Sequence, residues 1–174
     1  MDPSTDIVLR YEYATLTNPN AEPRTMQVRQ IVEGAEPADL YKRKNAETSV
    51  WENAGQIEWS SNTSGAVYFG VERAHAYLGG GRGQISIREL RKPKKPSSQS
   101  RRFKVNGTEY KWKLAENNTD MTCVSDSLGA RGKPLATWTD ATRTLRVAER
   151  AEPFLDRVVV TCLLHVWFRR WNAW

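Results

Sequence analysis

The sequence predicts a mainly β fold, a closed antiparallel β-barrel around a buried C-terminal α-helix. Short runs of alternating apolar and polar residues fill most of the chain, and turn-forming residues separate these runs. The chain then closes with a long apolar segment that contains no glycine. A length of 174 residues suits one domain, so we expect a single domain over residues 1–174.

Each alternating run has the length of a strand that is buried on one face. In the first run, Ile7, Leu9 and Tyr11 fall on the same face. Turn-forming residues follow such runs, for example at residues 18–20 and 79–83. Strands this short, at this spacing, indicate a meander that closes into a barrel or a sandwich. The predicted strands lie near Ile7, Met26, Ile57, Val67, Ile85, Met121, Leu135 and Thr144.

The clearest predicted hairpin spans residues 101–114. Its centre, Asn106-Gly107, is the preferred pair for a type I′ turn, because both turn residues need a positive φ. A two-residue turn fixes the register of the strands, and each favourable cross-strand pair then contributes about 0.2–1 kcal/mol. The predicted pairs are Phe103 with Tyr110, Lys104 with Glu109, and Val105 with Thr108.

A basic segment, residues 91–100, interrupts the strands. It contains two prolines and no apolar side chain that could be buried. Proline lacks a backbone N–H and dense charge resists packing, so the segment cannot be a strand or part of a core. We expect an exposed and mobile loop within the domain, because strand-like sequence resumes after it.

The last apolar segment is expected to form a helix over residues 153–172. Pro153 is well tolerated in a first helical turn. The valines 158–160 favour a strand by propensity, but a run of about twenty residues favours a helix more strongly. Polar residues recur every four positions and form one narrow stripe, so a helix that is apolar elsewhere must be buried. The stripe consists of Arg157, Thr161, His165 and Arg169.

Several motifs, taken in order, resemble a domain-of-unknown-function family found in mushroom-forming fungi. The likeness covers Ile57 to Arg170, and the insertion at residues 91–100 and the tail 171–174 depart from the family's pattern. Its specific parts are Tyr-Lys-Trp-Lys at residues 110–113 and Leu-Asp-Arg-Val-Val-Val-Thr at residues 155–161. The other matching residues are Gln56 to Trp59, Phe103, Gly107, Glu109, Leu114, Leu135, Ala136 and Phe154.

That family is similar to the tubby C-terminal and phospholipid-scramblase-like barrels. The resemblance therefore implies a closed antiparallel barrel threaded by a C-terminal helix. It implies no reaction. Tubby-like relatives suggest contact with phosphoinositides or membranes, but no phosphoinositide-binding motif is matched here residue by residue, and a shared fold is only an analogy for function.

Positive charge is concentrated in one part of the chain. The net charge is +6, and between Arg82 and Lys104 the only acidic residue is Glu89. Such a cluster favours an anionic partner, and a merely solvated loop is the alternative. Nucleic-acid sites usually interleave aromatic side chains, and none occurs here before Phe103, so we expect anionic lipid or an acidic protein instead. The predicted contact residues are Arg91, Lys92, Lys94, Lys95, Arg101, Arg102 and Lys104.

A second candidate site is a pocket at one barrel mouth, lined by His165 or by His75, with Asp156 as a further candidate. His165 and Asp156 are about two and a half helical turns apart, too far to form a dyad. The alternative is that each side chain satisfies backbone groups inside the barrel. Two histidines exclude a three-histidine metal site, and no ligand-spaced motif supports another, so we predict no metal and no cofactor.

Two cysteines, Cys123 and Cys162, are too few for a disulfide framework, and we expect free, buried thiols. The N-terminus shows no signal peptide, and the apolar run 158–168 is shorter than the ~20 residues of a membrane span, so we expect an intracellular protein. The tryptophans of the last segment, which close the barrel or form an exposed patch, are Trp167, Trp171 and Trp174.

Three functions stay open at this point. We favour a non-catalytic module that binds an anionic lipid or membrane surface through the basic segment. The alternatives are an enzyme or small-molecule carrier with a pocket near His165, and a protein-interaction domain. The sequence sets neither the ligand nor the oligomeric state.

Overall fold

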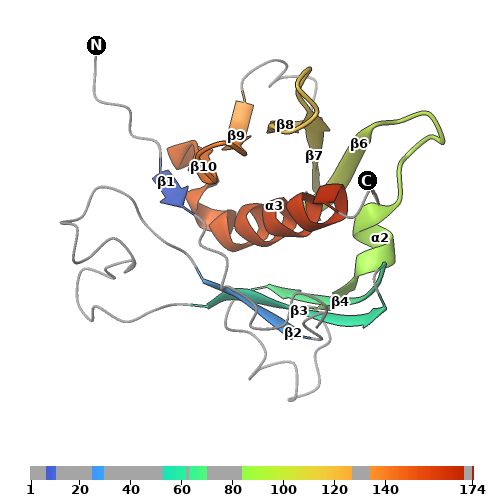
Figure 1. Ribbon diagram of the computed structural model, residues 1–174. Coiled ribbons are helices and arrows are strands. Elements are labelled where there is room, and N and C mark those ends of the chain that lie inside the picture. Colours follow the sequence, from blue (N-terminus) through green and yellow to red (C-terminus); the bar gives the residue numbers. More distant parts are fainter. Residues whose placement is uncertain are drawn as a thin grey trace, which may run out of the picture.

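The computed structural model describes residues 7–10, 25–29, 53–61, 63–69, 84–126, 134–170 and 174. These residues form two antiparallel sheets with a long C-terminal helix, α3, running between them (Figure 1). The fold is therefore mainly β with a C-terminal helix, as predicted. Within the described ranges neither sheet closes on itself, so the closed barrel is not confirmed.

The larger sheet has six strands, and the chain winds through five of them as a meander. The sixth, β1, pairs with the last strand, β10, along residues 7–10. The order from edge to edge is β1 (Ile7–Arg10), β10 (Thr144–Val147), β9 (Pro134–Thr139), β8 (Met121–Ser125), β7 (Thr108–Leu114) and β6 (Ser100–Val105). Among the described strands, one end of this sheet is thus the edge strand β6.

The smaller sheet has four strands in sequential order. They are β2 (Thr25–Arg29), β3 (Asn53–Ser61), β4 (Ser64–Phe69) and β5 (Gln84–Ser86). The β3–β4 turn requires a glycine at Gly65, where a Cβ atom would lie 2.0 Å from the backbone oxygen of Glu58. All eight regions predicted as strands contain a strand in the structure.

The predicted hairpin is confirmed in its turn and in its register. Asn106 and Gly107 have φ values of 47° and 82°, as a type I′ turn requires. Phe103 stands opposite Tyr110, and their ring centroids lie 5.5 Å apart in a stacked arrangement. Local turn chemistry and cross-strand packing therefore act together in this part of the chain.

The C-terminal helix is confirmed, with a later start. A 3-10 helix, η3 (Glu149–Phe154), contains Pro153 and leads directly into α3 (Leu155–Arg170). The valines 158–160 are at most 1% exposed, which shows that burial of a long apolar segment overrides their preference for strands. α3 packs on β2, β3 and β4 of the smaller sheet.

A buried hydrogen bond ties α3 to the larger sheet. The indole Nε1 of Trp112 on β7 donates to Oγ1 of Thr161 at 3.0 Å, and both side chains are fully buried. The Thr161 hydroxyl in turn donates to the carbonyl of Arg157 at 2.7 Å. The large indole thus fills the space between sheet and helix without leaving its N–H unpaired.

One short helix, α2 (Ile87–Arg91), was missed by the sequence prediction. The alternation of Ile85 and Ile87 predicted a strand, but the strand β5 ends at Ser86. Ser86 caps the helix, because its Oγ accepts a hydrogen bond from the N–H of Arg88 at 3.2 Å. With Glu89 three positions later, Ser86 has the spacing of a capping box, a signal that the alternation concealed.

Candidate functional site

The segment predicted as a loop, residues 91–100, joins α2 to β6 without forming a strand. Its limits are shifted, since Arg91 ends α2 and Ser100 begins β6. A turn closes where the N–H of Ser98 donates to the carbonyl of Lys95 at 2.9 Å. The carbonyl of Gln99 accepts a bond of 2.9 Å from the indole of Trp174. The mobility of this segment remains a prediction.

Arg101 is 6% exposed and is not a surface residue. Its guanidinium donates to the carbonyls of Ser98 and Ser100 and lies 5.3 Å from the ring centroid of Trp174. Burial, and then the nearby charge of Arg91, lower the pKa of Arg101. Arg101 therefore organises the start of β6 and is unsuited to contact a partner.

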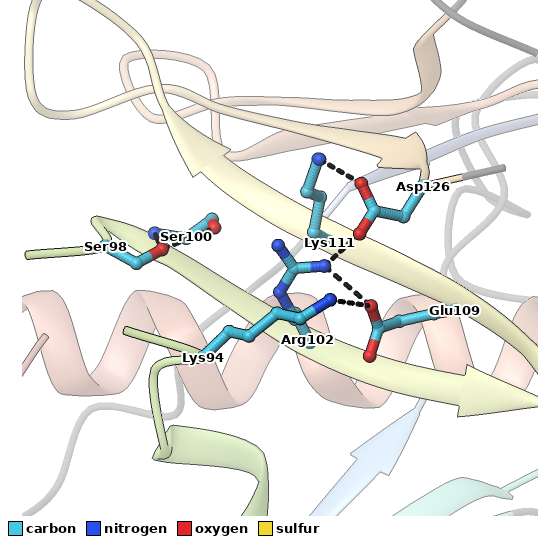
Figure 2. A network of polar contacts seen from close by, with 7 residues as sticks. All are labelled: Lys94, Ser98, Ser100, Arg102, Glu109, Lys111 and Asp126. Carbon is cyan, nitrogen blue, oxygen red and sulfur yellow. Dashed lines mark hydrogen bonds and ion pairs between the residues drawn. The ribbon is translucent and has the colours of Figure 1, made fainter. Parts of the chain in front are cut away.

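Arg102 is held in a network of ion pairs on the outer face of the β6–β7–β8 strands (Figure 2). Its Nη1 lies 2.7 Å from a carboxylate oxygen of Glu109 and also bonds the carboxylate of Asp126. Lys111, directly opposite Arg102 in the register, bonds the same Asp126. The shared carboxylate thus offsets the repulsion between two like charges on facing strands.

Arg102 and Asp126 shift each other's pKa. Hydrogen bonds from Lys111 and then Arg102 hold the pKa of Asp126 well below its usual range. Burial alone would lower the pKa of Arg102, but Asp126 and Glu109 outweigh it, so that pKa is raised. Both side chains stay charged at neutral pH and neutralise each other, and Arg102 adds little free charge to the surface.

Four of the predicted contact residues remain as exposed cations: Lys92, Lys94, Lys95 and Lys104. Lys94 lies 3.8 Å from Glu109, a distance and a 61% exposure at which an ion pair contributes little. Although Lys104 stands opposite Glu109 as predicted, Glu109 bonds its diagonal neighbour Arg102 instead. Arg91 is half-buried, with its guanidinium 5.4 Å from the ring centroid of Phe168.

Three of these lysines border a groove of about 320 Å³ between α2 and β6. Its apolar lining consists of Leu90 and Phe103, which are almost fully buried, and of Ile85 and Pro93. Lys95 does not line the groove. The charged side chains around it are Glu89, Lys92, Lys94, Arg102, Lys104 and Glu109. The sequence identified the basic residues but gave no sign of the apolar floor beside them.

A second hollow, of about 540 Å³, lies on the smaller sheet. Its lining is polar and includes Tyr68, whose hydroxyl donates to the carboxylate of Glu58 at 3.3 Å, together with Ser60, Ser64 and Arg88. It lacks the apolar surface that buries most of a small ligand in known binding pockets. We do not assign a function to it.

His165 lies inside the core and lines neither hollow. It is fully buried, and within the described residues neither ring nitrogen has a hydrogen-bond partner. The prediction that it satisfies backbone groups is therefore wrong. Its ring contacts Phe168 and Trp174, at centroid distances of 6.3 and 5.3 Å. Burial, and then the charge of Arg101, lower the pKa of His165 to about 3, so the ring is neutral at physiological pH.

The other candidates for chemistry are not brought together with His165. Asp156 lies near the start of α3, where its carboxylate accepts from the N–H of Arg157 at 2.8 Å. His75 and Trp171 lie outside the described residues. Cys123 and Cys162 are free and buried, as expected, and burial raises the pKa of each thiol. Within the described ranges no three His, Cys, Asp or Glu side chains are placed to hold a metal.

The other tryptophans of the last segment are partly buried. Trp167 and Trp174 both pack against the core, which favours the interpretation that they close the structure. No helix in the part of the chain that the structure describes is long and apolar enough to cross a bilayer.

These features define a mainly β domain that encloses a core helix and carries a lysine-bordered groove beside an edge strand. The chain matches a family of unknown function, DUF6593, over residues 2–171, and it belongs to that family. Comparison with curated proteins and with solved structures gives no match. The fold and the surface chemistry must therefore carry the argument for function.

Proposed function

We propose that this chain is a non-catalytic binding module that attaches to anionic surfaces, foremost an anionic membrane leaflet, through Lys92, Lys94, Lys95 and Lys104. One observation carries the proposal. All four lysines are exposed, three of them line one groove, and none has an ion pair shorter than 3.8 Å among the described residues. Their charge is therefore available to a partner.

The expected attraction is modest and depends on salt. An anionic leaflet attracts each nearby lysine by roughly 1 kcal/mol, so a few lysines acting together give measurable but weak attachment. Exposed charges are screened within about 8 Å at physiological ionic strength, so binding of this kind weakens as salt is added. The three arginines among the predicted contact residues make contacts within the domain. They are Arg91, Arg101 and Arg102.

Liposome co-sedimentation tests the proposal. Vesicles that contain phosphatidylserine are compared with neutral phosphatidylcholine vesicles, at low and at physiological salt. We expect binding to the anionic vesicles alone, and its loss in the triple variant Lys92→Glu, Lys94→Glu, Lys95→Glu. Lys113→Glu, at an exposed position on β7, is a single-charge control to be compared with Lys94→Glu. Equal binding to both vesicle types, or none at low salt, would overturn membrane attachment.

A protein-interaction domain is the second candidate, and one observation favours it. The lysines border a groove with an apolar floor beside the open edge of β6, a more specific feature than a flat charged surface. An enzyme or carrier with a pocket at His165 receives no such support, because neither described hollow is lined by that residue.

We also propose that the two sheets and α3 form a variant of the tubby-like barrel in which the β5–β6 seam and the β1–β2 seam are both open. The support is the antiparallel order of both sheets and the position of α3 between them. An experimental structure in which β5 and β6 share a ladder of backbone hydrogen bonds would contradict this arrangement.

A further inference from the structure

Among the residues that the structure describes, nothing pairs with the outer edge of β6, which presents unpaired backbone groups at two positions. The hydrogen bonds between β7 and β8 show which backbone groups of β6 face β7. On that side of β7, the N–H of Asp126 donates to the carbonyl of Glu109 at 3.0 Å. The backbone of Glu109 thus points toward β8, so Lys104 and Glu109 form a non-hydrogen-bonded pair. The N–H and C=O groups of Lys104, and by alternation those of Arg102, therefore point away from β7.

No other part of the described chain occupies these groups. Ser100, the third residue in this phase, is covered, because its N–H donates to Oγ of Ser98 and its carbonyl accepts from Arg101. The backbone groups of Arg102 and Lys104 have no such partner in the described ranges. Arg102 and Lys104 are also lining residues of the groove between α2 and β6. The groove is therefore bounded on one side by free donors and acceptors.

The side chains around this edge fall into two sets. Phe103 points inward and, with Leu90 and Ile85, forms the apolar floor of the groove. Lys104 is exposed, and Lys92 and Lys94 line the same groove. Glu89 opposes these lysines with a single negative charge, whereas Glu109 is bonded to Arg102.

We propose that the β6 edge binds an extended acidic peptide, which adds as a short antiparallel strand beside Arg102 and Lys104. This proposal rests on the proposed function, because it uses three of the same four lysines, Lys92, Lys94 and Lys104, and it names the partner. Acidic side chains at alternate positions of the peptide lie beside the lysines, and the apolar side chains between them point to the floor. The backbone hydrogen bonds supply affinity, and the lysines and the floor supply selectivity.

The charge of this surface argues against a second copy of the chain at the same edge. Two β6 strands that pair across a twofold axis would bring Lys104 of each copy close to like charges. A lipid leaflet offers negative charge but no backbone groups to pair with Arg102 and Lys104. An acidic peptide satisfies the charges and the backbone groups together.

The test uses capped, fluorescein-labelled Glu-Val-Glu-Val-Glu and its lysine counterpart, with the full chain at low salt and binding followed by fluorescence anisotropy. We expect the acidic peptide alone to bind. In an antiparallel pair the residue opposite Lys104 directs its N–H toward β6, so methylating the glutamate amides weakens binding about tenfold or more, whereas methylating the valine amides does not. If methylating the valine amides weakens binding and methylating the glutamate amides does not, the peptide adds as a parallel strand, which still supports binding at the edge. Equal tolerance of methylation at every amide overturns it.

Protein variants separate this proposal from membrane attachment. Lys104→Gln removes one charge, and Lys104→Pro also removes the free N–H, which an edge strand tolerates. We expect weaker peptide binding in Lys104→Gln and still weaker binding in Lys104→Pro, at unchanged melting temperature. Lys95→Gln is expected to weaken vesicle binding only, because Lys95 does not line the groove.

The remaining outcomes distinguish the two proposals. Vesicle binding without peptide binding overturns the edge site and leaves membrane attachment in place. Binding of neither probe at low salt overturns both. Should Lys104→Pro fail to fold, the methylated peptides still decide the question with the unmodified chain.

Discussion

The core helix α3 buries polar side chains, whereas the basic segment between α2 and β6 exposes them to solvent. In α3, Thr161 and His165 are fully buried, and the helix lies between two sheets. In the basic segment, Lys92, Lys94 and Lys95 are exposed, and little of their charge is used within the domain. Stability is thus expected to depend on the first region and binding on the second.

This contrast shows that a count of basic residues does not measure a binding surface. Arg101 and Lys104 are three positions apart on one strand, yet the first is buried under Trp174 and the second faces solvent. Strand alternation separates them. The arginines make contacts within the domain, Arg101 with backbone carbonyls and a ring and Arg102 with two carboxylates, whereas the exposed lysines are left for a partner.

The largest expected effect is on the core side of the comparison. Leu164→Ala should lower the free energy of unfolding by about 2–5 kcal/mol, because Leu164 is fully buried between the sheets and a cavity would remain. Urea unfolding followed by circular dichroism measures this loss. Lys113→Ala, at an exposed position, is the control. A Leu164→Ala protein as stable as the parent would show that α3 is not the centre of the core.

The next effect is the acid sensitivity of His165. Its pKa falls from 6.5 in the unfolded chain to about 3 in the folded one, so the unfolded state takes up a proton first as pH falls below 6.5. His165 does not change the free energy of unfolding above pH 6.5. Between pH 6.5 and pH 3 its contribution should lower that free energy by up to about 1.4 kcal/mol per pH unit.

His165→Phe isolates this contribution. Phenylalanine does not titrate and leaves no unpaired ring nitrogen, so the variant should lose most of the pH dependence between pH 6.5 and 4.5 and be at least as stable at pH 7. Urea unfolding at several pH values measures both quantities. The same slope in parent and variant would mean that other groups cause the acid sensitivity.

A smaller effect on stability is expected for the ion-pair network of Arg102, Glu109, Lys111 and Asp126. Asp126→Asn leaves Arg102 and Lys111 facing each other without the carboxylate that joins them, at a cost of about 1 kcal/mol, because solvent screens this partly exposed network. Because the pKa of Asp126 is lowered, its contribution is present above pH 3.8 and is lost as pH falls below it. The loss of stability in Asp126→Asn should therefore shrink under strongly acidic conditions.

The smallest effect is expected where binding depends on the lysines. The triple variant Lys92→Glu, Lys94→Glu, Lys95→Glu should change the unfolding free energy by no more than about 0.5 kcal/mol, since these side chains are exposed to solvent. Limited trypsin digestion should cut the parent chain first in this segment. A large fall in melting temperature would show that the segment contributes to the core, and the comparison would fail.

The sequence predicted best the elements that are determined by a short turn motif or by a long apolar segment. Asn106-Gly107 decides the hairpin and its register by turn geometry alone. For α3, the length of the segment and its apolar character outside one polar stripe outweigh three β-branched residues in a row. In both cases the deciding interactions lie within the segment or require only that it be buried.

The features that the sequence did not predict depend on contacts across the chain. The burial of Arg101 requires Trp174, which is 73 positions away, and the network at Arg102 requires Asp126. The helix α2 depends on the Ser86 cap, which competes with strand-like alternation. The groove arises only because the buried side chains Leu90 and Phe103, from a helix and a strand, meet beside the lysines.

One measurement tests most directly whether the lysine-bordered edge of β6 is the binding surface. A titration of the isotopically labelled chain with Glu-Val-Glu-Val-Glu, followed by amide chemical shifts in NMR spectra at low salt, reports the backbone positions other than proline together. The account predicts shifts concentrated at Lys92, Lys94, Arg102 and Lys104, with the amides of α3 little changed. Shifts centred elsewhere, or a spectrum unaltered by excess peptide, would contradict it.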